Sequence, residues 1–388
     1  NLNNSIQENV KGMRVVKSFV REDYEKNKFG KASEEVCADF TKAERLVALN
    51  SPVMQIAMYT AMIIVSYVGA KLIINSGASE MGVGALSSMF TYGMQILSSL
   101  MMLSMIFVMI TISNASIQRI CEVLNEESTI ENPENPKTDV PDGSIDFNGV
   151  SFKYHADAEK NALTDINLHI RSGETIGIIG GTGSSKSSLI QLISRLYDAT
   201  EGEVLVGGSN VKDYDIETLR SAVSVVLQKN VLFSGTIKEN LRWGDMNATD
   251  EELVRVCKLA QADEFINTLP DGYDTHIEQG GTNVSGGQKQ RLCIARALLK
   301  KPKIIIFDDS TSAVDTKTDA LIRNALATEI PDTTKIIIAQ RISSVQDADR
   351  VVVMEDGRIN AVGTHDELLE SNEIYKEVYY SQNKAGEE

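Results

Sequence analysis

The sequence of 388 residues has few cysteines, and no two of them stand at a spacing typical of a disulfide framework or a zinc site. The four cysteines, which lie far apart, are Cys37, Cys121, Cys257 and Cys293. We therefore expect free thiols in a reducing compartment and no metal ligated by cysteine. An excess of basic residues is also missing, because the formal net charge is −16 and residues 126–388 alone carry −17. Nucleic-acid binding requires clustered Lys and Arg, so no nucleic acid is expected as a partner.

Two long stretches contain no charged residue at all. The first, Leu46–Ala70, has 25 residues, and as a helix it would be roughly 37 Å long. The second, Met81–Gln118, has 38 residues and can continue beyond a membrane as a helix. Because the hydrocarbon core of a bilayer is about 30 Å thick, each stretch can cross it. The alternative is a buried helical hairpin in a soluble protein, but soluble core helices rarely avoid charge over such a length.

The charges that flank these stretches predict their orientation. The loop Asn75–Glu80 between them has no Lys or Arg, whereas the outer flanks have several, so both outer ends are expected in the cytoplasm. Within residues 1–125 we expect membrane helices at about 46–74 and 82–110. Two membrane helices form a hairpin, which is not enough to enclose a pathway across the membrane. The sequence also starts without an initiator methionine, so we expect it to be part of a longer protein.

A linker and a second domain follow the hydrophobic part. Three of the seven prolines fall within residues 126–143, among acidic and polar residues, which is typical of a linker. Residues 144–154 and 162–170 then alternate as strands, and the pattern from residue 173 onward mixes strands and helices. This order predicts an α/β domain over residues 144–388 with a largely parallel central sheet.

The stretch Gly180–Ser188 lies between an apolar run that predicts a buried strand, 175–179, and a segment with helical spacing, 189–193. Small residues let successive backbone N–H groups close around an anion, and the helix N-terminus adds its positive dipole end. We expect Lys186 to reach the β- and γ-phosphates of a nucleotide and the Ser187 hydroxyl to bind Mg²⁺. The candidate binding residues of this phosphate loop are Gly181, Thr182, Gly183, Ser184, Ser185, Lys186, Ser187 and Ser188.

Two further motifs point to the same chemistry. The apolar run 304–307 ends in two carboxylates, and Asp308 at such a strand end is expected to hold Mg²⁺ through water. A second glycine-rich helix entry, suited to a γ-phosphate, consists of Ser285, Gly286, Gly287 and Gln288. Taken alone, this second motif also fits an ordinary N-capped helix.

In combination, these motifs resemble the ATP-binding cassette (ABC) family, and the resemblance covers nearly the whole chain. Residues 284–288 match the family's signature motif. The resemblance implies that Tyr154 stacks on adenine, that Gln228 contacts Mg²⁺ and faces the membrane domain, and that Ser312–Asp315 crosses a dimer interface. It also implies that the hydrophobic part holds the last two membrane helices of an exporter half. Residues 12–19 would then be a coupling helix that docks on the partner's nucleotide-binding domain.

Three positions depart from the family pattern, and all surround one nucleotide. Asp309 stands where the family has a Glu that orients the attacking water, and a displacement of about 1 Å can lower a rate on the order of 10²-fold. Gln340 replaces a His that contacts the γ-phosphate, and a Gln side chain hydrogen-bonds but carries no charge. Ser185 replaces a Gly before the lysine. The candidate catalytic residues are Asp309, Gln340 and Lys186, in a site expected to hold ATP and cleave it slowly.

The signature at residues 285–288 is intact, and in the family's head-to-tail dimer it completes the partner's site. The resemblance therefore implies the degenerate-site subunit of a heterodimeric multidrug-type exporter. Its fold would be a partial α-helical transmembrane domain followed by an α/β P-loop nucleotide-binding domain. We expect ATP and Mg²⁺ as cofactors, a second, non-identical half-transporter and the lipid bilayer as partners, and a small lipophilic substrate such as a drug or lipid. The protein would be a multi-pass protein of the plasma or inner membrane, with a cytoplasmic nucleotide-binding domain.

Three alternatives stay open at this point. One is a homodimeric exporter that hydrolyses ATP at two equivalent sites. Another is a soluble cassette ATPase that acts on nucleic acid or ribosomes, which the charge-free stretches and the acidic balance disfavour. The last is a regulatory module that binds ATP without driving transport.

Overall fold

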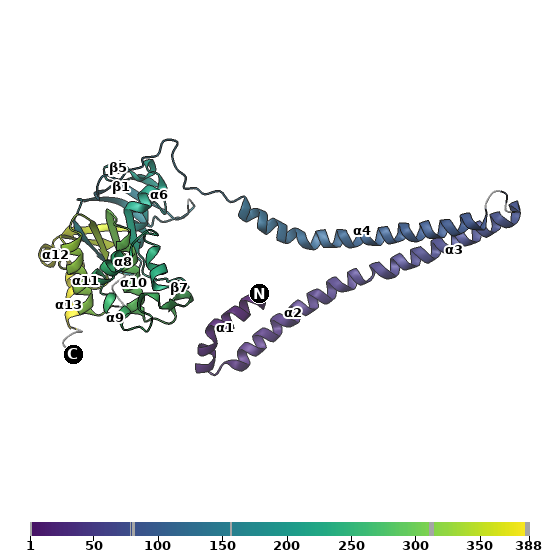
Figure 1. The fold of residues 1–388 in the computed structure, drawn as a ribbon, viewed down its shortest axis with the longest axis horizontal. Coiled ribbons are helices and arrows are strands. Elements are labelled where there is room, and N and C mark those ends of the chain that lie inside the picture. Colours follow the sequence, from purple (N-terminus) through teal and green to yellow (C-terminus); the bar gives the residue numbers. More distant parts are fainter. Residues whose placement is uncertain (1, 78, 80–81, 156, 310–313, 385–388) are drawn as a thin grey trace. The chain divides into compact units, whose positions relative to one another are not determined.

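The computed structural model describes residues 2–77, 79, 82–155, 157–309 and 314–384. The chain divides into two compact units, residues 1–127 and 128–388 (Figure 1). The first unit is helical and the second is built from strands and helices. Each unit is described by itself.

The helices of the first unit are α1 (Leu2–Ser18), α2 (Glu22–Ala48), α3 (Asn50–Ser76) and α4 (Val83–Leu124). Helix α1 packs on α2, where the Asn9 amide donates to Glu25 Oε2 at 3.0 Å. Only Leu49 separates α2 from α3, and its φ of −69° and ψ of −22° are helical, so the two run on as one helix. Gly77, with φ of 53°, ends α3 in the left-handed conformation common at helix C-termini.

Helices α3 and α4 form a hairpin (Figure 1). Asn50 at the start of α3 donates its side-chain N–H to Ser104 Oγ of α4 at 3.0 Å. Large apolar side chains are exposed along both helices, and α4 has no buried residue in the described part of the chain. The helical stretches Glu22–Ser76 and Val83–Leu124 are both long and apolar enough to cross a membrane. A helix that is apolar on all sides requires lipid or further protein around it.

Within the described residues, the second unit contains a large six-stranded sheet, a four-stranded antiparallel sheet and a two-stranded sheet of β7 (Gly235–Thr236) and β8 (His276–Ile277). The strands of the large sheet, in spatial order, are β12 (Arg358–Gly363), β11 (Arg350–Glu355), β3 (Thr175–Gly180), β10 (Thr334–Ile338), β9 (Ile304–Asp308) and β6 (Val223–Val226). Neighbouring strands are parallel except β12, which is antiparallel to β11. The expectation of a largely parallel sheet in an α/β domain is confirmed.

The antiparallel sheet has the order β2 (Leu163–Ile170), β1 (Ile145–Phe152), β4 (Glu201–Val206), β5 (Ser209–Asn210). The sequence pattern predicted β1 and β2 as strands but did not place them in a sheet of their own. The helices that surround the sheets include α5 (Lys186–Ile193), α6 (Ile216–Ala222), α7 (Ile237–Arg242), α8 (Asp250–Leu259), α9 (Asp263–Asn267), α10 (Gly286–Leu299), α11 (Thr316–Glu329), α12 (His365–Ser371) and α13 (Glu373–Lys384).

The large sheet is buried on both faces, which explains its continuous apolar strands. In β9, Ile304 and Ile306 belong to the core that also contains α5 and the antiparallel sheet. Ile305 and Phe307 of the same strand belong to the opposite core, with residues of α8, α10 and α11. This alternation follows from the two-residue period of a strand.

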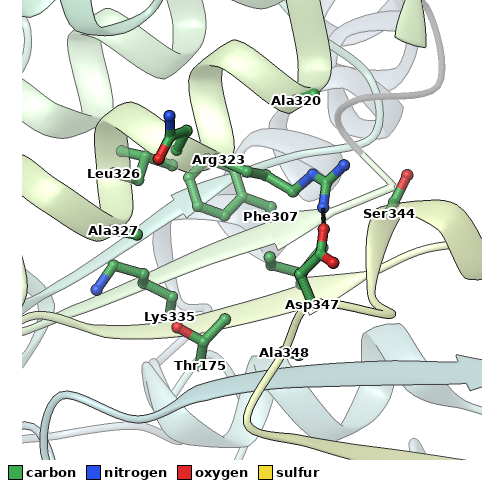
Figure 2. Close-up of a pocket in the computed structure, with 12 residues that line it drawn as sticks. Thr175, Phe307, Ala320, Arg323, Leu326, Ala327, Lys335, Ser344, Asp347 and Ala348 are labelled. Atoms are coloured by element: carbon green, nitrogen blue, oxygen red, sulfur yellow. Dashed lines mark hydrogen bonds and ion pairs between the residues drawn. The ribbon is translucent and has the colours of Figure 1, made fainter. Parts of the chain in front are cut away.

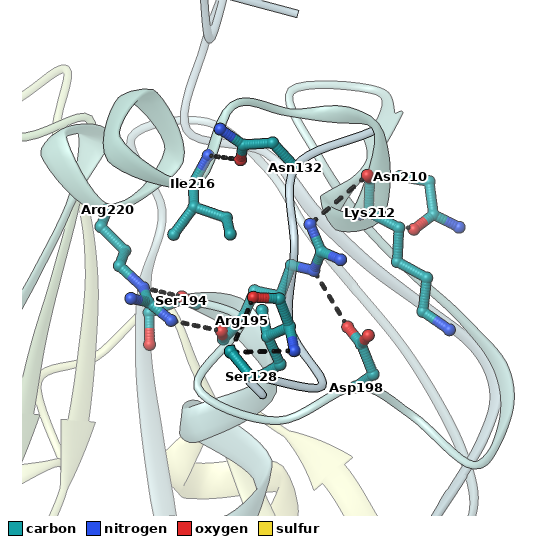
Figure 3. A network of polar contacts seen from close by, with 10 residues as sticks. Ser128, Asn132, Ser194, Arg195, Asp198, Asn210, Lys212, Ile216 and Arg220 are labelled. Atoms are coloured by element: carbon teal, nitrogen blue, oxygen red, sulfur yellow. Dashed lines mark hydrogen bonds and ion pairs between the residues drawn. The ribbon is translucent and has the colours of Figure 1, made fainter. Parts of the chain in front are cut away.

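The predicted linker, residues 126–143, lies against the α/β unit from Ser128 onward. Lys137 forms a parallel bridge with Tyr214. Asn132 Oδ1 accepts the N–H of Ile216 at 2.8 Å and so serves the N-terminus of α6 (Figure 3). The compact unit therefore includes most of this segment.

A polar network holds the turn after α5 in place (Figure 3). Arg195 is buried in the left-handed conformation, with φ of 49°. Its guanidinium donates to Asp198 Oδ1 at 3.0 Å, and its carbonyl accepts from Arg220 Nη2 at 2.8 Å. The network therefore connects the end of α5 to α6.

We predict that Gly180→Ala destabilises the α/β unit, whereas Gly181→Ala does not. A Cβ at Gly180 would lie 2.3 Å from the Met354 carbonyl oxygen, but one at Gly181 would meet nothing within 4 Å. Overpacking of this kind costs about 2 kcal/mol, which lowers the Tm of a unit of this size by roughly 4–8 °C. The fluorescence of Trp243, the single tryptophan, reports unfolding of this unit. Equal Tm values for the two variants would contradict the prediction.

Candidate nucleotide-binding site

The carboxyl ends of three neighbouring strands meet at one edge of the large sheet. Strand β3 leads into the phosphate loop, β9 ends at Asp308 and β10 is followed by Gln340. A cleft of about 530 Å³ lies there. The predicted site residues that line it are Gly181, Thr182, Gly183, Ser185, Lys186, Ser187, Ser188, Gln228, Asp308, Asp309 and Gln340. Ser184 is buried behind the loop, where its Oγ accepts from Lys186 Nζ at 3.2 Å.

Backbone conformation explains why glycine suits position 185. Gly183 and Ser185 both have positive φ, 87° and 68°, and Ser185 is the N-cap of α5. A non-glycine residue in this region pays roughly 1–2 kcal/mol. The sequence shows that Ser185 replaces a glycine, and the structure adds that the backbone at this position is strained.

Lys186 is half-buried and its ammonium group turns back onto its own loop. Nζ donates to the carbonyls of Gly180 and Gly181 at 2.7 and 2.9 Å. Burial lowers the pKa of Lys186, while the nearby carboxylates of Asp309 and Asp308 oppose that shift. The cation is therefore held at the loop, beside the space in which an anion would fit.

Ser187 and Asp308 approach each other across the cleft, with Ser187 Oγ donating to Asp308 Oδ1 at 3.0 Å. Burial raises the pKa of Asp308, and the hydrogen bond from Ser187 partly offsets this. In the described part of the chain, no group of three or more His, Cys, Asp or Glu forms a metal cluster. These two oxygens fit Mg²⁺, which keeps most of its waters and takes few protein ligands beside phosphates.

Two glutamine side chains contact the carboxylate of Asp309. Gln340 Nε2 donates to Asp309 Oδ2 at 2.7 Å, and Gln228 Nε2 donates to the same oxygen at 3.2 Å. Asp309 also has a left-handed backbone, with φ of 47°. Both amides thus bind the same oxygen of the carboxylate, the group that would have to orient an attacking water.

Tyr154 lies beside the phosphate-loop helix. Its hydroxyl is 2.8 Å from Ser188 Oγ, and its exposed ring meets Phe152 and Tyr197 edge to face. The ring position is compatible with a base stacked beside the loop. Its role with adenine stays a prediction.

The signature residues lie apart from this cleft. Ser285 is the N-cap of α10, where its Oγ accepts from the N–H of Gln288 at 3.3 Å and Gln288 Oε1 accepts from the N–H of Ser285 at 2.9 Å. Ser285 and Gly286 are exposed. The described residues that line the cleft do not include residues 285–288. The helix entry is thus free to face another molecule.

Two residues of the predicted interface loop, Ser312 and Ala313, fall outside the described residues. Asp315, at the end of that loop, caps α11 by accepting the N–H of Thr318 at 3.0 Å, and this bond lowers the pKa of Asp315.

Helix α13 also contributes to the cleft, although no sequence motif predicts it. Val378 lines the cleft, and Gln382 contacts the backbone on both sides of Arg341. The sequence of this segment carries no motif, so only the fold could bring it to the site.

A second cavity, of about 320 Å³, lies between α11 and the strands β3, β9 and β10 (Figure 2). Its floor includes Phe307 and Leu326. Arg323 at its rim pairs with Asp347 at 2.8 Å, and Lys335 Nζ donates to the Thr333 carbonyl at 2.9 Å. Because both cations bind groups of the protein itself, this cavity is less suited to an anion than the phosphate-loop cleft is.

The chain matches two models of one family. A model described as ABC transporter matches residues 163–312, and one described as ABC transporter transmembrane region matches residues 1–100. A solved structure, described as a bacterial Atm1-family ABC exporter with ATP bound, superposes with a TM-score of 0.87 at 29% identity. The alignment covers 97% of this chain and 66% of that one.

Curated relatives show the same likeness over nearly the whole chain. An uncharacterized ABC transporter ATP-binding protein of Mycobacterium tuberculosis is 40% identical over 98% of this chain and 65% of its own length. A putative multidrug export ATP-binding/permease protein of Staphylococcus aureus is 40% identical over 97% of this chain and 65% of its own length. The chain thus spans about 65% of the length of these relatives. A helical region that matches the transmembrane model thus stands ahead of an α/β domain that matches the ABC transporter model.

Proposed function

We propose that this chain is the ATP-binding subunit of a membrane exporter and that its own nucleotide site cleaves ATP slowly. The observation that carries the slow site is the Asp309 carboxylate, which is short and accepts two glutamine amides on one oxygen. The named relative from Staphylococcus aureus and the named exporter structure support the transport role.

The residues of the cleft fit ATP and Mg²⁺. The phosphate loop and the N-terminus of α5 would surround the phosphates, with Lys186 turning from its loop carbonyls to the β- and γ-phosphates. Ser187 and Asp308 would hold Mg²⁺, Asp308 through water, and Gln228 would contact it as well. Mg²⁺ supplies charge neutralisation for phosphoryl transfer. Gln340 would donate to the γ-phosphate, and Asp309 would orient the attacking water.

We further propose a non-identical partner. The capped, exposed Ser285 at the start of α10 would complete the partner's site across a head-to-tail interface. The three departures, at positions 185, 309 and 340, all affect this chain's own nucleotide. Because this chain's own site is impaired while its signature is intact, a heterodimer is favoured over a homodimer. The homodimer is the competing assignment.

In the same proposal, residues 1–125 are the end of a transmembrane domain and residues 144–388 the cytoplasmic nucleotide-binding domain, joined by 126–143. Membrane helices at about 46–74 and 82–110 would contact lipid, and residues 12–19 would dock on the partner. Closure of the two nucleotide domains on ATP would drive export of a small lipophilic drug or lipid.

Steady-state ATP hydrolysis in lipid tests this assignment. We predict low turnover by the chain alone and higher turnover once its non-identical partner is co-purified. Ser285→Ala should then lower turnover by on the order of 10-fold or more, because it removes a donor to the partner's γ-phosphate. Asp309→Asn should change it less than about twofold, since a slow site contributes little to the total.

The opposite pattern would identify a homodimer. If the chain alone turns over ATP and Asp309→Asn abolishes the activity, Asp309 is a working catalytic carboxylate and the slow-site proposal is wrong.

A second prediction restores the family residues. Asp309→Glu combined with Gln340→His should raise turnover by the chain's own site, by up to about 100-fold, because the carboxylate then extends by about 1 Å. Single-turnover hydrolysis with the partner's site disabled measures this directly. An unchanged or lower rate would show that Asp309 and Gln340 are not what limits the site.

A third prediction concerns strain at Ser185. Ser185→Gly should raise the Tm of the α/β unit by roughly 1–4 °C, because relief of left-handed strain exceeds the added freedom of the unfolded chain. Thr182→Gly in the same exposed loop, where φ is not positive, is the matched control and should leave the Tm equal or lower. A lower Tm for Ser185→Gly would refute the strain argument.

A further inference from the structure

The C-terminal helix α13 binds the backbone beside the nucleotide cleft through Gln382. Gln382 Nε2 donates to the carbonyl oxygen of Gln340 at 2.7 Å, and Gln382 Oε1 accepts the N–H of Ile342 at 2.9 Å. Both partners are backbone groups with fixed roles, one an acceptor and one a donor. The orientation of the Gln382 amide therefore follows from its partners.

The two hydrogen bonds enclose one residue, Arg341, between β10 and the short turn Ile342–Ser344. Ile342 is buried in the core on the α13 side of the sheet. The Gln382 amide thus binds the carbonyl of Gln340 before Arg341 and the N–H of Ile342 after it. This fixes the direction in which the Gln340 side chain leaves the backbone.

Helix α13 is itself anchored to the core. Tyr375 is fully buried, its hydroxyl lies 2.7 Å from His365 Nδ1, and its N–H donates to Asn372 Oδ1 at 2.9 Å. One turn further on, Val378 lines the nucleotide cleft. Gln382 follows Val378 by four residues, which places both on one side of the helix. The helix therefore presents Gln382 from a rigid base.

The side chain of Gln340 in turn reaches Asp309, which follows the end of β9. Its Nε2 donates to Asp309 Oδ2 at 2.7 Å, although Gln340 as a residue is exposed. A long side chain has several rotamers, and which of them are allowed depends on the backbone dihedrals. The contact from Gln382 restrains those dihedrals.

We propose that Gln382 is a positioning residue of the nucleotide site, holding the Gln340 amide where it meets the γ-phosphate of ATP. This inference rests on the proposed function, because it requires ATP in the phosphate-loop cleft. Gln382 acts through Gln340 and touches no nucleotide itself. Loss of Gln382 therefore affects binding of ATP and not of ADP, which lacks the γ-phosphate.

The test compares equilibrium binding of ATP and ADP to the full chain in lipid, without Mg²⁺ so that no turnover occurs. Gln382→Met keeps the length of the side chain but removes both hydrogen bonds. We expect ATP affinity to fall on the order of fivefold to tenfold, with ADP affinity unchanged within about twofold. Gln382→Glu, whose carboxylate faces the Gln340 carbonyl, should weaken ATP binding further. Ser381→Met, at the exposed neighbouring position, is the matched control and should bind both nucleotides like wild type.

A double-mutant cycle identifies the route of the effect. If Gln382 acts through Gln340, then Gln382→Met has no further effect on ATP affinity in a Gln340→Ala background. Additive effects, or an equal loss of ATP and ADP affinity, would show that Gln382 merely stabilises the fold and would overturn the proposal. If wild type binds neither nucleotide and Lys186→Ala changes nothing, the proposed function fails and this inference fails with it.

Discussion

Burial of the large parallel sheet on both faces is the constraint on which the rest of the α/β unit depends. In β9, Ile305 faces one core and Ile306 the other, and the polar residue of this strand, Asp308, stands at its carboxyl end. Because β3, β10 and β9 are parallel neighbours, their carboxyl ends bring the phosphate loop, Gln340 and Asp308 to one edge. The order and direction of these strands therefore place the polar residues of the site together, where the chain leaves the sheet.

Two residues at that edge have a backbone conformation that normally favours glycine. Ser185 and Asp309 are both left-handed, although neither is a glycine. Residues in such conformations persist only where surrounding structure holds them, and they gather at functional sites. The oxygen of Asp309 that accepts from Gln228 and Gln340 joins two loops that come from separate strands. Changes in either loop are thus communicated to the same carboxylate.

The sequence was sufficient for those parts of the site that obey a local pattern. The strand–loop–helix around Lys186 and the strand ending in Asp308 could be predicted because glycine spacing and apolar runs have direct backbone meanings. The antiparallel sheet could not, because its central pairing, of β1 with β4, joins segments that lie far apart in the sequence. Gln382 was also beyond prediction, since a glutamine in a polar helix gives no signal until the fold sets it beside Ile342. Position 185 was recognised as unusual, but its left-handed φ required the structure.

The helical unit has a mechanical property that follows from Leu49 and Pro52. Because Leu49 keeps helical dihedrals, the chain from Glu22 to Ser76 keeps one helical course over 55 residues, roughly 80 Å long. Pro52 follows closely and has no N–H to donate to the Ala48 carbonyl, so the hydrogen-bond ladder is weakened at this junction. Bending of the helix is therefore concentrated between its polar half and its apolar half, where the aqueous part meets the part that lipid would surround.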